Sequence, residues 1–409
     1  MKAITRFTPS LLQNSTITKI PFTIISSLSL NGRFKAIRIL VLTGLAAVGL
    51  ITSMLPAWGA RNIRARFQGL GQMPGVVIQP GECGTQAFGI SGDGNVIVGA
   101  GCVPSSQPGG FVDQAFRWTV TGGYQLLGDL GSGISDAYAA SFDGSVVVGS
   151  SPPPEAFFGS FRWTATQGMM AVPVGCCPNA VTDDGTMVAG GNAWWKTSGE
   201  TGNFGDGSCT DPQAPLTMVD LSADGSLAAG SGKGGLDMFG QQATNAYQST
   251  PTGNCQDIDA VFNRNSDASG ISADGSTIVG EAQDSQGHYR AFRWTASTGM
   301  VDLGTLGGNN LLSNALATNQ DGSVVVGTSL TTSSPDSNHA FIWIATRGIQ
   351  DLQTVLKNHG ARIPNGWILQ VATDISEDGT VITGYGISPP VQGSNFGQTE
   401  PWRAVLPLR

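Results

Sequence analysis

Seven of the eight Asp-Gly pairs in this 409-residue chain have the same neighbours. A Ser, Thr or Asn stands two residues before each Asp, and a Gly stands six residues after it. The seven Asp residues are Asp93, Asp143, Asp184, Asp224, Asp274, Asp321 and Asp378. The eighth pair, Asp206-Gly207, lacks these neighbours and is interpreted as an ordinary turn. Because all seven copies keep the rule, we expect the chain to repeat one structural unit.

We call each of these seven Asp-Gly pairs, with its preceding Ser, Thr or Asn and its following Gly, a marker. Each marker predicts a β-hairpin. The Ser, Thr or Asn can bond back to the backbone, Asp fits the turn, and Gly accepts positive φ because it has no Cβ. A type I turn followed by a left-handed Gly gives a three-residue hairpin loop. The residues that follow are rich in Val and Ile, as in Val146–Val148. Such runs are typical of strands that are buried on both faces.

An aromatic segment follows each marker and is expected to form a core strand. Its clearest form is Phe-Arg-Trp-Thr, at Phe116–Thr119, Phe161–Thr164 and Phe292–Thr295. The expected core tryptophans are Trp118, Trp163, Trp195, Trp294, Trp343 and Trp402. A basic residue recurs beside the aromatic residue, at Arg117, Arg162, Arg293 and Arg403. Its repetition predicts a scaffold role, either stacking on aromatic rings or pairing with a neighbouring repeat.

The length of the repeat indicates the architecture. A third segment, Leu-Gly-x-Leu, is clear at Leu127–Leu130 and Leu303–Leu306, so each unit contains about four short strands. The seven Asp residues are on average 47.5 residues apart. Both values match one blade of a propeller, whereas short-coil solenoids repeat at roughly half this period. We predict an all-β fold, a seven-bladed β-propeller that forms a single domain over residues 60–409.

The phase of the repeat predicts how the ring closes. The last unit stops after Pro401–Leu408 and lacks its fourth strand. The missing segment precedes the first unit, at Phe67–Met73, where Leu70-Gly71-Gln72-Met73 aligns with the segment Leu303–Leu306. An N-terminal strand that completes the last blade would cover both open sheet edges, which otherwise invite aggregation.

Residues 1–59 have the composition of an export segment. They contain six Lys or Arg and no acidic residue, and the apolar run Ile39–Ile51 precedes Ala57-Trp58-Gly59. This is a secretory signal pattern, and the run is too short for a typical membrane span. We therefore expect an exported protein, extracellular or periplasmic, without a stable membrane span in the mature chain. An uncleaved anchor is the alternative.

The chain after residue 59 is acidic. It keeps 15 basic and 29 acidic residues, a net charge of −14. This charge leaves no basic stripe, so nucleic acid is not an expected partner.

Six cysteines follow the export segment, at Cys83, Cys102, Cys176, Cys177, Cys209 and Cys255. An oxidising compartment favours disulfides. Cys83 and Cys102 flank the first hairpin almost symmetrically, which predicts a disulfide between them. The pairing of the other four stays open. A zinc site is disfavoured because there is no Cys-x-x-Cys and the chain has only three His.

No catalytic residue, cofactor or metal site is predicted from the sequence. The marker Asp residues could bind calcium, but seven separate carboxylates do not make one site. His288 and His339 each precede an aromatic segment, and His288 is followed by Tyr289 and Arg290. A base near a Tyr could carry out proton chemistry, yet similar positions in two repeats favour a structural role.

The combined segments resemble a known family. Ser272–Gly280, Ala291–Thr295 and Gly299–Gly308 are similar to the extracellular repeats called the HAF family. The resemblance covers most of Phe67–Leu408 and is weakest in the third and fourth units. It implies a secreted bacterial protein and supplies no catalytic residues.

Two functions follow from these observations. The first is a non-enzymatic binding or scaffold propeller with a protein, peptide or glycan on one face. The alternative is a carbohydrate-active hydrolase or lyase, which would need two carboxylates of opposed pKa, or a base and an Arg, on inserted loops such as Lys196–Leu216. Further insertions at Val103–Gly110, Lys233–Thr244 and Ser329–Ser337 are expected on the rims of the ring.

Overall fold

The computed structural model describes residues 64–76, 84–105, 110–175, 178–205, 216–236, 242–259, 265–308, 310–334, 337–390 and 397–407. The chain divides into Met1–Arg61 and Asn62–Arg409, and every described residue belongs to the second unit. The predicted export segment lies outside the described residues. Within the described ranges, no helix is long and apolar enough to cross a membrane.

The first four blades follow one another along the chain. Blade 1 is β2 (Thr85–Ile90), β3 (Val96–Pro104), β4 (Phe111–Thr119) and β5 (Gly123–Leu126). Blade 2 is β6 (Asp136–Ala140), β7 (Val146–Ser150), β8 (Ser160–Thr164) and β9 (Gly168–Val172). Blade 3 is β10 (Pro178–Val181), β11 (Met187–Gly190), β12 (Ala193–Lys196) and β13 (Thr201–Asn203). Blade 4 is β14 (Thr217–Leu221), β15 (Ala228–Leu236), β16 (Gln242–Ser249) and β17 (Cys255–Asp257).

The last three blades include the only helix of the described residues. Blade 5 is β18 (Ser266–Ile271), β19 (Thr277–Gln283), β20 (Tyr289–Thr295) and β21 (Gly299–Gly304). Blade 6 is β22 (Ser313–Thr318), β23 (Val324–Leu330), β24 (Asn338–Ile344) and β25 (Gly348–Asp351), followed by α1 (Leu352–Asn358). Blade 7 is β26 (Ile368–Ile375), β27 (Val381–Ser388), β28 (Gln398–Val405) and β1 (Arg66–Gly69).

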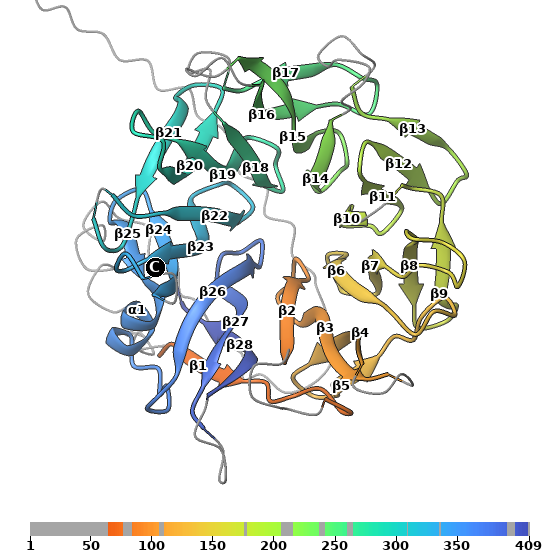
Figure 1. Ribbon diagram of the computed structural model, residues 1–409, viewed down its shortest axis with the longest axis horizontal. Helices are drawn as coiled ribbons and strands as arrows, with labels where there is room; N and C mark the ends of the chain where they lie inside the picture. The colour runs from red at the N-terminus through yellow and green to blue at the C-terminus, as the bar shows by residue number, and fades with distance from the viewer. Residues whose placement is uncertain are drawn as a thin grey trace, which may run out of the picture. The chain divides into compact units, whose positions relative to one another are not determined.

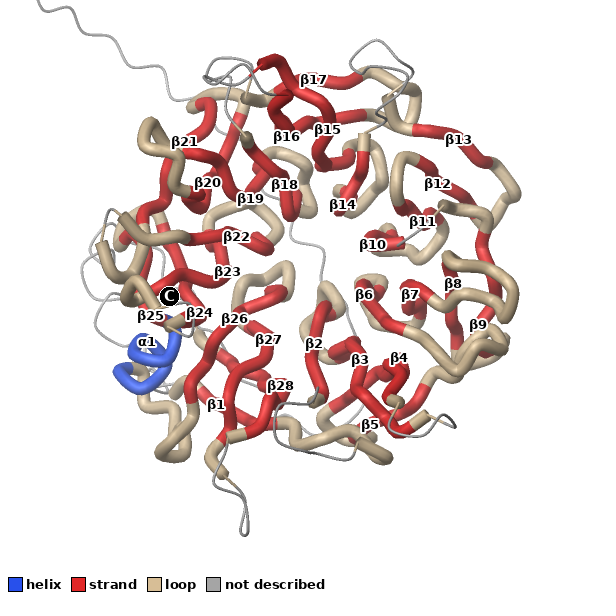
Figure 2. The backbone as a smooth tube through the Cα atoms, viewed as in Figure 1, coloured by secondary structure: helices blue, strands red, loops and turns tan. Residues whose placement is uncertain are grey.

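The seven four-stranded sheets form a ring, with β2, β6, β10, β14, β18, β22 and β26 nearest its centre (Figure 1). All pairings within the sheets are antiparallel, and strands account for nearly all the regular structure (Figure 2). The predicted all-β, seven-bladed β-propeller is therefore confirmed.

The N-terminal strand pairs with the end of the chain. β1 is antiparallel to β28, with Phe67 opposite Ala404 and Gly69 opposite Trp402. The phase of the repeat predicts this pairing. The contribution of the strand to ring closure stays a prediction, which is tested in the Discussion.

The core lies mainly between neighbouring blades. The second strand of a blade is buried on both faces, as Val146, Val147 and Val148 are in blade 2. Separate apolar clusters occupy the blade boundaries; the cluster between blades 1 and 2, for example, includes Val98 and Trp163. Each repeat therefore depends on its neighbours to bury its apolar side chains.

The predicted core tryptophans differ in burial. Trp118, Trp163, Trp294 and Trp402 are buried, at 0 to 5 % exposure. Trp195 and Trp343 are half-buried and pack against the clusters at the boundaries of blades 2 and 3 and of blades 5 and 6.

The cross-strand register places Trp402 differently from the other five tryptophans. Trp402 lies opposite Gly384, as Phe116 lies opposite Gly99, so it occupies the Phe position of the repeat. Ala404 occupies the Trp position of blade 7, opposite Ile382.

The Asp of each marker is used within its own turn. Ser91 Oγ donates to Asp93 Oδ1 at 2.6 Å and accepts from the backbone N of Val96 at 2.9 Å. Gly94 has a φ of 72°, and a Cβ there would lie 2.7 Å from Val381 Cγ2. In blade 2, hydrogen bonds donated by Ser145 hold the pKa of the Asp143 carboxyl below its usual value. These contacts support the structural interpretation of the marker.

The seven marker turns are joined in a closed circle of backbone hydrogen bonds. In every blade an N–H of the marker turn donates to a carbonyl of the next blade's turn, with N···O distances of 2.9 to 3.1 Å. The series starts with Asp93 N to Phe142 O and ends with Glu377 N to Gly92 O. The circle therefore fixes one end of the ring with main-chain bonds.

Candidate binding face

The two ends of the blades differ in regularity. One end carries the marker hairpins and the short turns between the third and fourth strands, such as Thr119–Gly123. The other end carries the connections between the second and third strands, which include all or part of the predicted insertions Val103–Gly110, Lys233–Thr244 and Ser329–Ser337. We call these ends the hairpin end and the insertion end. Variable loops on a rigid scaffold commonly carry binding residues, so the insertion end is the candidate binding face.

Side chains close the hairpin end further. The carboxyl groups of Asp183 in blade 3 and Glu377 in blade 7 hydrogen-bond to each other. Burial, together with this bond to Asp183, raises the pKa of Glu377 to about 7. The pair therefore links two blades that lie on opposite sides of the ring (Figure 1).

Two half-buried carboxyl groups connect blades near the ring centre. Asp220 in β14 accepts from the backbone N of Ile271 in blade 5 at 3.0 Å, and Asp374 in β26 accepts from that of Ile90 in blade 1 at 2.8 Å. Burial raises the pKa of Asp220 to about 6 and that of Asp374 to about 7. These groups have structural partners across the boundaries of blades 4 and 5 and of blades 7 and 1.

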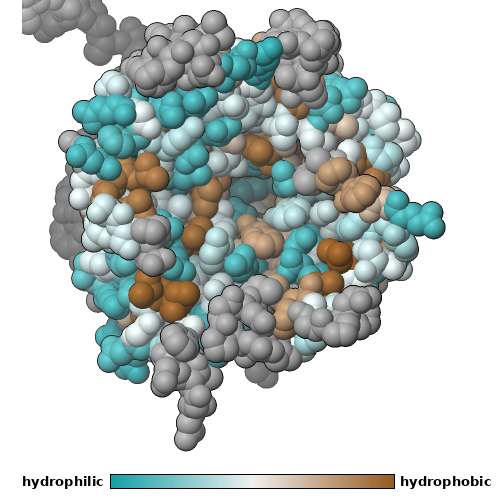
Figure 3. All heavy atoms as spheres, viewed as in Figure 1, coloured by the Kyte–Doolittle hydropathy of each residue, from teal (hydrophilic) through white to brown (hydrophobic). Residues whose placement is uncertain are grey.

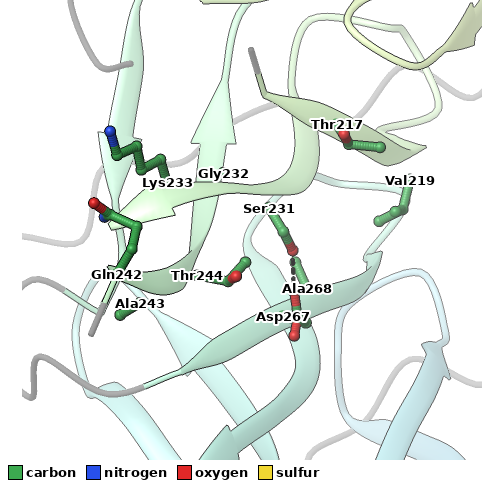
Figure 4. Close-up of a pocket in the computed structure, with 10 residues that line it drawn as sticks. All are labelled: Thr217, Val219, Ser231, Gly232, Lys233, Gln242, Ala243, Thr244, Asp267 and Ala268. Carbon is green, nitrogen blue, oxygen red and sulfur yellow. Dashed lines mark hydrogen bonds between the residues drawn. The ribbon is translucent and has the colours of Figure 1, made fainter. Parts of the chain in front are cut away.

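A pocket of about 590 Å³ opens at the insertion end between blades 4 and 5 (Figure 4). It is formed by β14, β15, β16 and the start of β18, and its lining includes Thr217, Lys233, Gln242, Thr244 and Asp267. Ser231 Oγ accepts from the backbone N of Ala268 at 3.1 Å, and this bond links β15 of blade 4 to β18 of blade 5. The space-filling view down the ring shows a hollow centre and only small, separate hydrophobic patches (Figure 3).

The pocket combines one cation, one carboxylate and several neutral polar groups. Asp267 lies directly opposite Glu281 in the register of β18 and β19. Burial, followed by the charge of Asp267, raises the pKa of Glu281. Like charges placed opposite each other in a sheet are destabilising, so the Asp267–Glu281 pair does not stabilise the sheet of blade 5. Lys233, hydroxyl groups and an amide complete a surface that can both donate and accept hydrogen bonds.

The two singled-out histidines lie in different blades, each beside an aspartate. His288 Nδ1 is 3.4 Å from Asp284 Oδ2 in blade 5, and His339 Nδ1 is 2.8 Å from Asp351 Oδ2 in blade 6. They do not converge on one site. Within the described ranges there is no group of three or more His, Cys, Asp or Glu placed to hold a metal ion.

The recurring arginines contact neighbouring blades. Arg162 Nε donates to Gly185 O in blade 3 at 3.2 Å, and Arg293 Nε donates to Gly322 O in blade 6 at 2.7 Å. Arg117 also lies 5.9 Å from the ring centre of Trp163. They act as the scaffold residues that their repetition predicts.

The predicted disulfide is only partly within the described residues. Cys102 lies buried in β3 and is disulfide-bonded. Cys83 lies outside the described residues, so the identity of the partner stays a prediction. Cys255 in β17 is also disulfide-bonded, and Cys176, Cys177 and Cys209 lie outside the described residues.

The sequence did not indicate the pocket between blades 4 and 5. Most of its residues come from blade 4, in which the repeat is less regular and is interrupted by an insertion, and Asp267 and Ala268 come from the start of blade 5. The one available signal was the polar insertion Lys233–Thr244 itself. The described parts of the Lys196–Leu216 loop form the turn into β13, and residues 206–215 lie outside the described residues.

The geometry defines a seven-bladed β-propeller with a polar candidate binding face. No protein-family model and no curated protein matches the sequence. The β-propeller domain of the Trilobed protease from Pyrococcus furiosus is similar in structure, with a TM-score of 0.50 and 8 % identity over 77 % of this chain and 95 % of that chain. An acylaminoacyl peptidase from Pyrococcus horikoshii has a TM-score of 0.49 and 10 % identity over 78 % of this chain and 50 % of that chain. Putative TolB from Agrobacterium tumefaciens has a TM-score of 0.40 and 13 % identity over 71 % of this chain and 88 % of that chain. Identities this low show the fold alone.

Proposed function

We propose that the protein is an exported, non-enzymatic binding propeller of the HAF-repeat type, which holds a peptide, protein or glycan at its insertion end. The observation that supports this function is the asymmetry of the ring. Main-chain bonds and the Asp183–Glu377 pair link the blades at the hairpin end, whereas the long insertions and the polar pocket between blades 4 and 5 occupy the other end. A rigid ring with one variable face is suited to recognition.

The carbohydrate-active enzyme is the weaker alternative. It needs one carboxyl group with a raised pKa and a second that stays ionised. Asp136 in β6 has a pKa raised to about 6 by burial and by the charge of Asp113. Burial also raises the pKa of Asp113, so this pair does not show the opposed shifts that such an enzyme requires.

The test is an array of glycans, peptides and proteins probed with the purified exported protein. We expect at least one class to bind, and the bound ligand to be recovered with its mass unchanged. Asp267→Asn at the insertion end should weaken binding, whereas Phe142→Ser at the hairpin end should leave it unchanged. Cleavage of the ligand, or a loss of binding in Phe142→Ser with none in Asp267→Asn, would contradict the proposal.

A further inference from the structure

Two neighbouring blades each pair an Arg or His with an Asp at the same repeat positions. Arg290 lies opposite Ala282, eight residues after marker Asp274, and His339 lies opposite Ser329, eight residues after marker Asp321. Their partners are equivalent too: Asp302 and Asp351 each lie opposite the Phe of the third strand. The side chains meet in both blades, at 3.6 Å for Arg290 and Asp302 and at 2.8 Å for His339 and Asp351.

Each pair lies in a pocket at the insertion end. In blade 5 a pocket of about 190 Å³ is lined by Arg290 and Asp302, with Phe292 and Met300 as apolar walls. In blade 6 a pocket of about 600 Å³ is lined by His339 and Asp351, with Ile349 in the position of Met300. The strand register therefore places a polar pair beside an apolar wall in the same orientation on two adjacent blades.

A third pair at these positions does not line either pocket. In blade 4, Asn245 Nδ2 donates to Asp257 Oδ2 at 2.8 Å, and Asn245 is buried at 1 % exposure. Both residues hold the equivalent strand positions, since Asn245 lies opposite Gly232 and Asp257 lies opposite Tyr247. Blades 1, 2 and 7 have Leu126, Ala171 and Gly69 in place of the aspartate. The blade 4 pair therefore supplies a matched internal control.

The chemistry of the two pockets favours a neutral polyhydroxylated ligand. A carboxylate only accepts hydrogen bonds, whereas a guanidinium only donates and an imidazole can donate, so each pair presents a donor beside an acceptor. Neighbouring hydroxyl groups of a sugar both donate and accept, and its C–H face can lie on half-buried Met300 or Ile349. An anionic ligand would meet an aspartate beside each cation. In blade 5 the carboxyl groups of Asp259 and Asp284 also line the pocket, and a cationic ligand would meet buried Arg290 there and Lys357 in blade 6.

We propose that blades 5 and 6 form two equivalent subsites for residues of one extended, neutral glycan. This inference rests on the proposed binding function and names its ligand class. Repetition of one polar pair on adjacent blades matches a polymer that repeats one sugar unit. Occupation of both subsites by one chain would raise its affinity above that of a short sugar.

The experiment measures calorimetric affinity for a panel of neutral hexasaccharides (cellohexaose, xylohexaose, mannohexaose and chitohexaose) and for the corresponding disaccharides. We expect at least one hexasaccharide to bind more tightly than its disaccharide. Asp302→Asn and Asp351→Asn should each weaken hexasaccharide binding about tenfold or more, the scale of one lost hydrogen bond to a charged group. The double variant should lose the preference for the longer sugar.

Asp257→Asn is the control, because it makes the same change at the blade 4 pair. It should leave affinity unchanged in protein that retains the wild-type melting curve, and Asp257→Ser serves if the first variant unfolds. Equal affinity of wild type, Asp302→Asn and Asp351→Asn would overturn the two subsites. If no hexasaccharide binds while a peptide or protein on the array does, the glycan inference is wrong and the proposed function stands. If nothing on the array binds, both are wrong.

Discussion

Arg403 Nη2 donates to the backbone carbonyl of Gly94 at 3.1 Å, across 309 residues of sequence. Arg403 lies in β28, the third strand of blade 7, and Gly94 is the turn glycine of blade 1. Arg117, Arg162, Gln248 and Arg293 make the same contact with the turn glycine of the next blade, at Gly144, Gly185, Gly275 and Gly322. One repeated bond therefore connects neighbouring blades and also joins the two ends of the ring.

Replacing Arg403 tests the contribution of this bond. Arg403→Met keeps most of the apolar stem and removes the donor. We expect the free energy of unfolding to fall by about 1.5–3 kcal/mol, as for other hydrogen bonds to charged groups. Arg347→Met is the matched control because Arg347 is exposed in a turn. Equal denaturation midpoints for the two variants would show that the contact adds no stability.

Deleting the N-terminal strand tests ring closure. A chain that starts near Gly75 lacks β1, which exposes the edge of β28 and removes Phe67 from its edge-on contact with Trp367 at 5.2 Å. We expect a sharply lower melting temperature and aggregation, because exposed sheet edges pair with other chains. Light scattering during a thermal melt measures both effects. A truncated protein that melts like the mature chain would refute closure by this strand.

The core tryptophans test the packing between blades. Replacing fully packed Trp118, Trp163 or Trp294 with Ala should cost about 3–5 kcal/mol, because it leaves a large cavity at a blade boundary. Trp343→Ala should cost less, since Trp343 is only half-buried. Denaturant titration gives the free energies, and iodide quenching reports exposure. A loss below about 1 kcal/mol at Trp118 would contradict its place in the core.

The sequence alone was sufficient to predict the number of blades, their strands and the pairing of β1 with the last blade. Each of these depends on local turn chemistry or on the phase of the repeat. The position of Trp402 was not predictable in the same way, because only the cross-strand register shows that it replaces Phe and that Ala404 replaces Trp. The circle of main-chain bonds between marker turns was also hidden, since backbone contacts leave little trace in residue identity.

The candidate site was harder to predict for a different reason. Lys233 and Asp267 belong to different blades and line one pocket only when the ring forms. The Arg290–Asp302 and His339–Asp351 pairs differ in residue type, so their equivalence appears only in the strand register. The sequence did show His288 and His339 in similar blade positions, but the structural counterpart of His339 is Arg290 rather than His288.

The carboxyl pair at the hairpin end predicts a pH effect on stability. The pKa of Glu377 is raised to about 7 in the folded protein, by burial and by its bond with Asp183. The folded state thus keeps a proton that the unfolded state releases above its ordinary pKa, and stability falls as pH rises through that window. Glu377→Gln cannot lose this proton. We expect the melting temperature of the variant, measured relative to that of wild type, to rise between pH 5 and pH 8.

A matched control for Glu377→Gln is Glu155→Gln, since Glu155 is exposed in the loop between β7 and β8. Its melting temperature should follow that of wild type at both pH values. A Glu377→Gln curve parallel to wild type would mean that Glu377 does not titrate in this window.

The first hairpin gives the last prediction. Cys102 lies in β3 and is disulfide-bonded, and the almost symmetrical spacing of the two cysteines about the marker predicts Cys83 as its partner. β2 and β3 are antiparallel, and Thr85 lies opposite Gly101, which directs the chain before Thr85 toward Cys102. The loop that this bond closes has about 19 residues, and the chain-entropy model gives roughly 3 kcal/mol of stabilisation for a loop of that size.

Peptide mapping without reduction should therefore find one fragment that joins Cys83 and Cys102. The double variant Cys83→Ser with Cys102→Ser should melt at a lower temperature, and reduction should no longer change the stability of this hairpin. A fragment that joins Cys102 to Cys176, Cys177 or Cys209 would overturn the pairing, and the register of β2 and β3 would then have to be tested independently.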